Sequence, residues 1–215
     1  LLGGVPGVAP AKVLVIGGGV VGTQAARMAV GMGADVTILD RSLPRLRQLD
    51  TEFDGRLKTV YSTADAMDQL IVEADLVIGA VLIPGAAAPK LVTEKHIKMM
   101  KKGSVVVDVA IDQGGCFATS KATTHQDPTY VVDDVVHYCV ANMPGGVART
   151  STMALTNATM PFAVTLANKG AKQALLDDAH LMAGLNVLGG KITYKPVADV
   201  LGYDYVAPED ALATL

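Results

Sequence analysis

The most restrictive feature of the sequence is the stretch KVLVIGGGVVG near its start, where an aliphatic run ends in a cluster of glycines. Gly17, Gly19 and Gly22 have the spacing G-x-G-x-x-G, and Val20 and Val21 separate the last two. After a buried strand, this pattern is typical of a turn into a helix whose free N–H groups receive a pyrophosphate. We assign the tight turn to Gly17, the approach of backbone to phosphate to Gly19, and close packing of helix on strand to Gly22. The same glycines are also compatible with a purely structural turn.

The second aliphatic run ends in Asp40, close to the spacing expected of an acid that hydrogen-bonds an adenosine ribose. With Asp40 in place, the glycine pattern indicates a dinucleotide site. A carboxylate about 4 Å from a 2′-phosphate would repel it by roughly 4 kcal/mol at an intermediate dielectric, so NAD is favoured over NADP. Arg41 and Arg45 weaken this preference, because an arginine at this point can receive a 2′-phosphate. We favour solvated charges at a helix start for both, and keep both as candidate cofactor contacts.

Six aliphatic runs alternate with segments of helix length, which predicts an α/β fold with a doubly wound parallel sheet of the Rossmann dinucleotide-binding type. Hydrophobic residues make up 50% of the chain but aromatic residues only 4%, so the core must be aliphatic, as in sheets buried on both faces. The predicted strands are 12–17, 35–40, 57–62, 75–81, 104–110 and 137–142. The predicted helices are 20–32, 43–52, 63–73 and 93–100, the last with Thr93 as its N-cap.

The pattern changes after NMPGGVARTS. Residues 147–169 predict one long helix that is rich in small residues, with a kink at Pro161 and a stop at Gly170. A second helix is expected over 171–184, followed by a Gly-Gly hairpin in NVLGGKITY and a short helix in PVADVLG. This tail is too small to form a second domain of its own.

Residues that follow the strands are the candidates for a ligand site, because open parallel sheets bind ligands beyond the carboxyl ends of their strands. Ser62 follows the third run and is interpreted either as an adenine contact or as a helix N-cap. Val81, Leu82 and Ile83 follow the fourth run as an apolar ledge, with ordinary core and a Pro-Gly turn as the equal alternative.

The fifth and sixth runs place polar groups where a nicotinamide would lie. Of the two acids in DVAIDQGG, we prefer Asp112 as the one that faces the site, since Asp108 lies within the apolar run and is suited to cap or tether the strand. Glycines 114 and 115 would open access to the backbone. Asn142 and Met143 follow the sixth run and add an amide and a flexible thioether.

Other chemistries find little support. The net charge is −3 and the basic residues are scattered, which argues against nucleic acid or an anionic membrane as a partner. No apolar run is long enough for a membrane helix, and we expect a cytoplasmic protein. No metal-ligand spacing is present. The histidines and cysteines form no credible catalytic pair; we expect surface positions for His96 and His180, a loop for His125, the start of the sixth strand for His137, and structural thiols for Cys116 and Cys139.

Several longer stretches together resemble alanine dehydrogenases, within the group that includes the nicotinamide-binding subunit of proton-translocating transhydrogenases. They are GGVPGVAPAKVLVIGGGVVGTQAARMAVGMGADVTILD, VDVAIDQGGC, VANMPGGVARTSTMALTNAT and LANKG. The resemblance covers nearly the whole chain. It implies reversible oxidative deamination of L-alanine with NAD to pyruvate and ammonium. Two alternatives stay open: a transhydrogenase subunit, and a non-catalytic NAD-binding fragment.

The resemblance also implies a domain organisation and a set of site residues. Residues 1–146 would be the NAD-binding domain, and 147–215 a C-terminal segment of a discontinuous substrate domain. Asp112 would be the catalytic acid near nicotinamide and substrate. The cofactor would be held by Gly17, Gly19, Gly22 and Asp40, with Ser62, Val81, Leu82, Val109, Asn142 and Met143 lining the rest of its groove.

The family further implies a homo-oligomer, by resemblance a hexamer, and a substrate-binding lysine and histidine that are not assigned in this sequence. The chain opens with Leu1 rather than methionine, so we expect it to be part of a longer or processed polypeptide. On this basis the chain is expected to bind NAD without oxidising alanine on its own.

Overall fold

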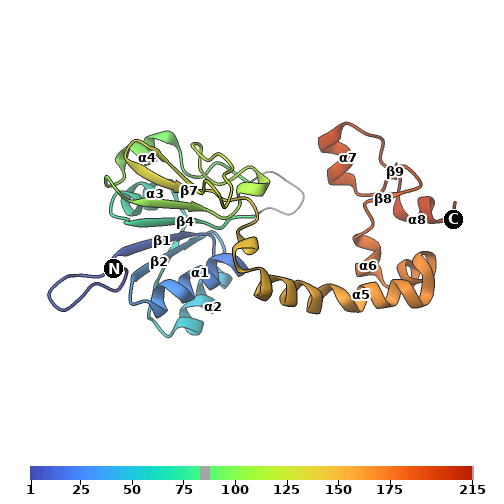
Figure 1. Cartoon of the computed structure of the whole chain (residues 1–215), viewed down its shortest axis with the longest axis horizontal. Helices are drawn as coiled ribbons and strands as arrows, with labels where there is room; N and C mark the ends of the chain where they lie inside the picture. Colours follow the sequence, from blue (N-terminus) through green and yellow to red (C-terminus); the bar gives the residue numbers. More distant parts are fainter. Residues whose placement is uncertain (83–87, 215) are drawn as a thin grey trace. The chain divides into compact units, whose positions relative to one another are not determined.

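The computed structural model describes residues 1–82 and 88–214 and divides the chain into two compact units, Leu1–Met143 and Pro144–Leu215 (Figure 1). We describe each unit separately. The proposal that the second one belongs to a substrate domain stays a prediction. Among the described residues, no helix has the length and apolar character needed to cross a membrane.

The first unit is built on a seven-stranded sheet in the order β3-β2-β1-β4-β5-β7-β6. Only the β6–β7 pair is antiparallel, so the predicted doubly wound parallel sheet is confirmed. The chain runs outward from β1 to β3 and returns to β4 on the other side of β1, which creates a topological switch point between β1 and β4. The strands are β1 (Lys12–Ile16), β2 (Asp35–Asp40), β3 (Lys58–Tyr61), β4 (Leu76–Gly79), β5 (Val105–Asp108), β6 (Thr129–Val132) and β7 (Val135–Tyr138).

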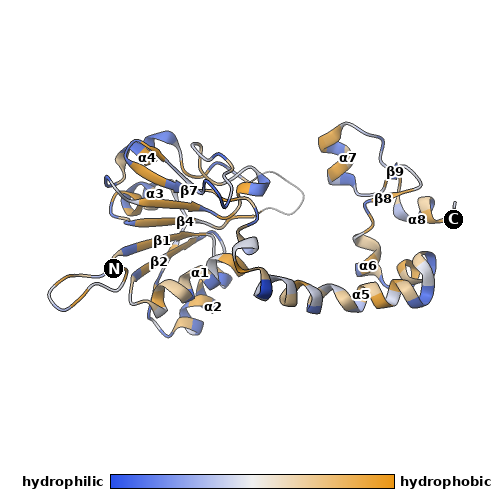
Figure 2. Cartoon of the chain, viewed as in Figure 1, coloured by the Kyte–Doolittle hydropathy of each residue, from blue (hydrophilic) through white to orange (hydrophobic). Residues whose placement is uncertain are grey.

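Aliphatic runs become central strands because both faces of the sheet are covered. Successive side chains of a strand point to opposite faces, so Leu14 and Ile16 pack with α3 and α4, while Val13 and Val15 pack with α1 and α2. Figure 2 shows the resulting hydrophobic strands. The helices are α1 (Val20–Gly31), α2 (Leu43–Phe53), α3 (Ala64–Ile71) and α4 (Glu94–Met99), each within two residues of its predicted bounds.

Helices α3 and α4 are joined by a histidine that the sequence had suggested lies on the surface. Thr93 is the N-cap of α4, as predicted, and its side chain accepts from the backbone N–H of His96. The His96 side chain is only 12% exposed, and its Nε2 lies 2.7 Å from Oδ1 of Asp68 on α3. The expected surface position of His96 is therefore wrong, because its ring links two helices.

The sixth predicted strand is shifted in the structure. Instead of one strand over 137–142, β6 and β7 form a hairpin over 129–138. The two residues between them, Asp133 and Asp134, have φ values of 49° and 62°. This left-handed pair is the conformation of a tight hairpin turn, which is normally signalled by Asn-Gly or Asp-Gly. Two aspartates do not carry that signal, so the hairpin was not predicted.

The second unit is helical, with one small hairpin. Gly170 breaks its long helix with a φ of 73°, as predicted, whereas Pro161 lies inside the helix. The expected helix over 171–184 is interrupted at Asp178, which caps the next helix through its side chain. The predicted hairpin forms at glycines 189 and 190. The elements are α5 (Ala148–Asp177), α6 (Ala179–Ala183), β8 (Val187–Leu188), β9 (Lys191–Ile192), α7 (Lys195–Leu201) and α8 (Pro208–Leu212).

Candidate functional site

A cleft of about 370 Å³ opens at the carboxyl ends of β1 and β4, at the switch point of the sheet. This is the position at which open α/β sheets bind their ligands. Seven of the residues singled out in the sequence meet here, together with Ala80. The lining residues are Gly17, Gly19, Val20, Val21, Asp40, Ala80, Val81 and Leu82.

The three motif glycines have different surroundings. Gly17 has a φ of 99°, and a Cβ on it would lie 2.8 Å from the carbonyl oxygen of Ala80. A Cβ on Gly22 would overlap the carbonyl oxygen of Gly17 and press against Val15 on β1. A Cβ on Gly19 would meet nothing within 4 Å. Gly17 and Gly22 therefore shape the turn, whereas Gly19 presents bare backbone to the cleft and leaves room for a phosphate.

Gly18, which the motif treats as a variable position, connects the turn to Asp40. Its N–H donates to Asp40 Oδ2 at 2.7 Å, and a Cβ on Gly18 would lie 2.7 Å from Leu49 Cδ1. The other carboxylate oxygen, Oδ1, accepts from the N–H of Ser42 at 2.7 Å. Asp40 is half-buried and fixed in place, and each of its oxygens retains capacity to accept from a ribose hydroxyl.

The Arg45 side chain also contacts this glycine turn, through hydrogen bonds to Gly18 and Thr23. Its Nε donates to the carbonyl of Gly18 at 2.6 Å, and its Nη2 donates to Thr23 Oγ1 at 2.7 Å. The Thr23 hydroxyl in turn donates to the carbonyl of Gly19 at 2.7 Å. The favoured expectation that Arg45 is a solvated charge is therefore wrong, since these contacts half-bury it. Arg41 is exposed, as expected.

Ser62 lies beside Asp40, and its backbone N–H donates to the Asp40 carbonyl at 2.9 Å. The alternative of a helix N-cap is wrong for Ser62, because Thr63 is the N-cap of α3 and accepts from the N–H of Ala66. In the apolar ledge, Val81 is half-buried and Leu82 is 54% exposed. Ile83 and the expected Pro-Gly turn lie outside the described residues.

The two acids at the end of β5 and in the turn after it have different surroundings. Asp108 is fully buried, and its Oδ2 accepts from the N–H groups of Cys116 at 2.8 Å and Phe117 at 3.3 Å, and from the Ser120 hydroxyl. It tethers the chain beyond the strand, as predicted. Asp112 is exposed on a short 3-10 turn, Ile111–Gln113.

Several predicted contacts are not among the described residues that line the cleft: Ser62, Val109, Asp112, Asn142 and Met143. That Asp112 faces the site stays a prediction. Val109 is half-buried, and its N–H donates to the carbonyl of Gly79 at 3.0 Å. Asn142 is exposed with a φ of 62°, and its carbonyl accepts from His125 Nε2 at 2.9 Å. Since β7 ends at Tyr138 and not at 142, a short connection separates Asn142 from the strand.

Both cysteines are buried, which is compatible with the structural roles expected of them. Burial raises the pKa of the Cys116 thiol to about 11, so this thiol stays protonated and unreactive at neutral pH. Cys139 is also buried. Within the described residues, no group of three histidine, cysteine or acidic side chains is arranged to hold a metal ion.

His137 is fully buried in the third position of β7, not at the strand's start. Its Nδ1 donates to the carbonyl of Val135 at 2.9 Å, and Nε2 lies 2.7 Å from the Thr119 hydroxyl. The ring stacks on Tyr130 with centroids 5.0 Å apart. Both ring nitrogens are thus satisfied in the neutral form of the imidazole.

We expect His137 to destabilise the protein in mild acid. Burial lowers its pKa from the ordinary value of 6.5, so the unfolded chain binds an extra proton as the pH falls through that value. Stability is full above it and declines below it, by up to about 1.4 kcal/mol per pH unit. Urea unfolding at about pH 7.5 and about pH 5.5 should show a smaller loss in His137→Phe, which keeps a ring on Tyr130. An equal loss in both proteins would contradict this expectation.

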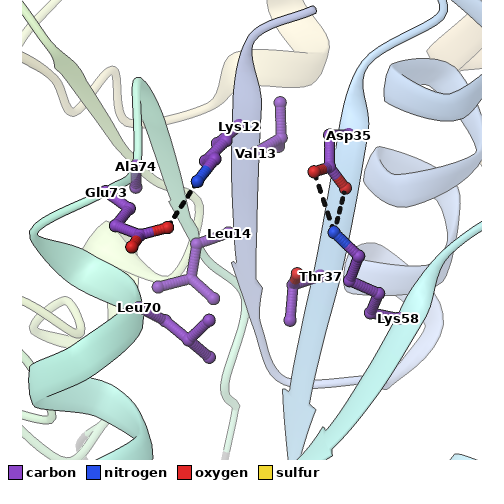
Figure 3. Close-up of a pocket in the computed structure, with 9 residues that line it drawn as sticks. All are labelled: Lys12, Val13, Leu14, Asp35, Thr37, Lys58, Leu70, Glu73 and Ala74. Carbon is purple, nitrogen blue, oxygen red and sulfur yellow. Dashed lines mark hydrogen bonds and ion pairs between the residues drawn. The ribbon is translucent and has the colours of Figure 1, made fainter.

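A second pocket, of about 80 Å³, lies at the amino ends of β1 and β2 (Figure 3). Lys12 pairs there with Glu73, and Lys58 pairs with Asp35 at 2.7 Å. Each of the four charges that line this small pocket already has a partner of opposite sign. We therefore assign these residues to surface ion pairs at the amino ends of the strands and assign no ligand to the pocket.

Comparisons with known proteins identify the relatives of the chain. The family model described as "Alanine dehydrogenase/PNT, C-terminal domain" matches residues 1–195. Alanine dehydrogenases of Halomonas elongata and Bacillus subtilis are 68% and 60% identical over 96% and 99% of this chain. The aligned region covers 56% of each relative, so the chain spans about half the length of these curated relatives.

Solved structures agree with this assignment. An L-alanine dehydrogenase structure superposes with a TM-score of 0.88 and 52% identity, covering 94% of this chain and 56% of that one. A transhydrogenase from Sinorhizobium meliloti gives a TM-score of 0.61 and 33% identity, covering 68% of this chain and 41% of that one. Since the family model matches well over half of the sequence, the chain belongs to the alanine dehydrogenase/PNT C-terminal domain family.

Proposed function

We propose that this chain binds NAD and forms the coenzyme-binding part of an alanine dehydrogenase. The reaction would convert L-alanine, NAD and water reversibly to pyruvate, ammonium and NADH. The observation that carries the proposal is the cleft at the switch point, where an open glycine turn and a fixed carboxylate, Asp40, lie side by side. The identity of 57–68% to named alanine dehydrogenases over nearly the whole chain supports the choice of substrate.

The residues of the cleft fit a dinucleotide. The N–H groups at the start of α1, bare at Gly19, would bind the pyrophosphate with the help of the helix dipole. Asp40 would accept from the ribose hydroxyls, and the ledge of Val81 and Leu82 would pack against the flat rings. When bound, NAD supplies the acceptor for the hydride of alanine. Asp112 is exposed, and its carboxylate would exchange a proton with the substrate amino group or with water.

The second unit supports a role in a larger assembly. Six large apolar side chains on α5 are at least 45% exposed, a density that is unusual on a free helix surface. We propose that residues 147–215 complete a substrate domain and that the protein is a homo-oligomer, as the resemblance implied. The exposed side chains are Met153, Leu155, Met160, Phe162, Val164 and Leu176.

The transhydrogenase alternative is less well supported, because identity to the solved transhydrogenase is 33%, against 52% to the solved L-alanine dehydrogenase.

One experiment tests whether the chain serves alanine oxidation or the transhydrogenase alternative. The part of the Bacillus subtilis enzyme that lies outside the matched region is joined to this chain, and NADH formation is followed after addition of L-alanine. We expect activity that is lost in Asp112→Asn. A chimera that binds NADH but leaves alanine unoxidised would contradict the proposed reaction.

A further inference from the structure

The backbone around Asp112 is held from the inside by Asp108. One oxygen of this fully buried carboxylate accepts from two N–H groups and one hydroxyl of the segment 116–120. A Cβ on Gly115 would collide with the same oxygen, and Gly115 has a φ of 79°. The chain therefore has to close tightly over Asp108 directly after the turn that carries Asp112.

Lys90, whose side chain is exposed, contacts the same stretch of backbone. Its Nζ donates to the carbonyl oxygens of Gly114 and Phe117, the latter at 3.0 Å. Backbone hydrogen bonds add to this contact, since the N–H of Ala88 donates to the Gln113 carbonyl at 2.8 Å and the N–H of Leu91 donates to the Cys116 carbonyl at 2.9 Å. The carboxylate thus accepts from donors of residues 116–120, and the ammonium donates to the carbonyls of Gly114 and Phe117.

Asp112 depends on this clamp for its position. Its exposed side chain forms no hydrogen bond within the described part of the chain, so only the backbone of the 3-10 turn determines where the carboxylate points. Lys90 is exposed and has no carboxylate partner there. An exposed lysine ordered by two carbonyls gains little net stability, because ordering its long side chain costs entropy. Its contacts are better explained by the geometry that they impose.

We propose that Asp108 and Lys90 are positioning residues that fix Asp112 at the nicotinamide end of bound NAD. This inference rests on the proposed function. A displacement of about 1 Å at a reacting group can lower a rate by roughly 100-fold, so contacts that hold the segment directly after the turn would affect chemistry, and contact with the nicotinamide, through the position of Asp112. The proposed pyrophosphate and ribose contacts at Gly19 and Asp40 lie at the start of α1 and the end of β2, and the hydrogen bonds of Asp40 involve neither Lys90 nor Asp108.

The test compares two ligands on the 215-residue chain: NADH, and ADP-ribose, which lacks the nicotinamide. Lys90→Met should weaken NADH binding about tenfold, because a displaced Asp112 would lose a charged hydrogen bond to the nicotinamide, and leave ADP-ribose binding within about twofold of wild type. Lys90→Arg keeps N–H donors and should restore most of the NADH affinity. The control is Lys98→Met, which removes an exposed lysine that lies on α4. It should change neither the NADH nor the ADP-ribose affinity. Asp108→Asn should act in the same direction as Lys90→Met.

A double-mutant cycle tests whether Lys90 acts through Asp112. In an Asp112→Ala background, Lys90→Met should cause little further loss of NADH affinity, because the group that it positions is gone. Additive losses, equal losses of both ligands, or no loss in Lys90→Met would overturn the proposal. So would a wild-type chain that binds NADH no more tightly than ADP-ribose. A wild-type chain that binds neither ligand would instead refute the proposed function.

Discussion

Replacing Asp40 with alanine should remove most of the preference for NADH over NADPH. In the wild type, the carboxylate would accept from the ribose hydroxyls of NADH and repel the 2′-phosphate of NADPH. Two unit charges about 4 Å apart interact by roughly 4 kcal/mol at an effective dielectric of about 20. Because Asp40 is half-buried, we expect solvent to reduce this to a preference of about 100-fold. Fluorescence titration with both coenzymes measures it.

The fixed position of Asp40 makes two variants informative. Asp40→Ala should lower NADH affinity by about tenfold or more, since hydrogen bonds to a charged acceptor contribute about 1.5–3 kcal/mol, and it also frees the N–H groups of Gly18 and Ser42. Asp40→Asn keeps an acceptor and removes the charge, so it should improve NADPH binding with a smaller loss for NADH. Asp50→Ala, on the exposed side of α2, is the control. A wild-type chain that binds NADPH as tightly as NADH would refute the ribose assignment.

The parallel strands and their helices could be predicted because short stretches of sequence determine each of them. Each central strand is mainly aliphatic, as sheets buried on both faces require. The helix bounds follow from apolar spacing and caps such as Thr93. The β6–β7 hairpin escaped prediction because its turn is formed by Asp133 and Asp134, whose identity carries no strong hairpin signal. The local sequence pattern therefore predicts the parallel strands well and the antiparallel strands at the edge of the sheet poorly.

The parts of the site that could not be predicted depend on contacts between distant residues. Arg45 meets Gly18 across 27 positions, and Lys90 meets Gly114 across 24. In both cases an ordinary charged residue acquires its role only from the tertiary structure. The motif positions, by contrast, were predictable because the turn itself restricts them: Gly17 needs a positive φ and Gly22 has no room for a side chain. Sequence patterns thus identified most of the residues that line the cleft, but missed the side chains that hold its loops.

Two glycines of one motif should separate stability from binding. A methyl group on Gly22 would overlap the carbonyl oxygen of Gly17, and relief of this overlap requires α1 to move away from β1. We expect Gly22→Ala to cost about 3 kcal/mol or more, which lowers the melting temperature by roughly 6–12 °C. Thermal unfolding followed by circular dichroism provides the measurement.

Gly19→Ala should weaken NADH binding and leave the stability of the protein nearly unchanged. Its Cβ would meet no protein atom within 4 Å, and its φ of −67° suits alanine, so the stability should change by no more than about 1 kcal/mol, the ordinary difference between these residues at an N-cap. The methyl would instead occupy the space of the pyrophosphate and weaken NADH binding by about 100-fold, or about 2.8 kcal/mol. Gly31→Ala, in the last turn of the same helix and also without close neighbours, should leave NADH binding unchanged. Normal NADH affinity in Gly19→Ala would mean that the pyrophosphate does not bind at this turn, whatever the stability of the variant.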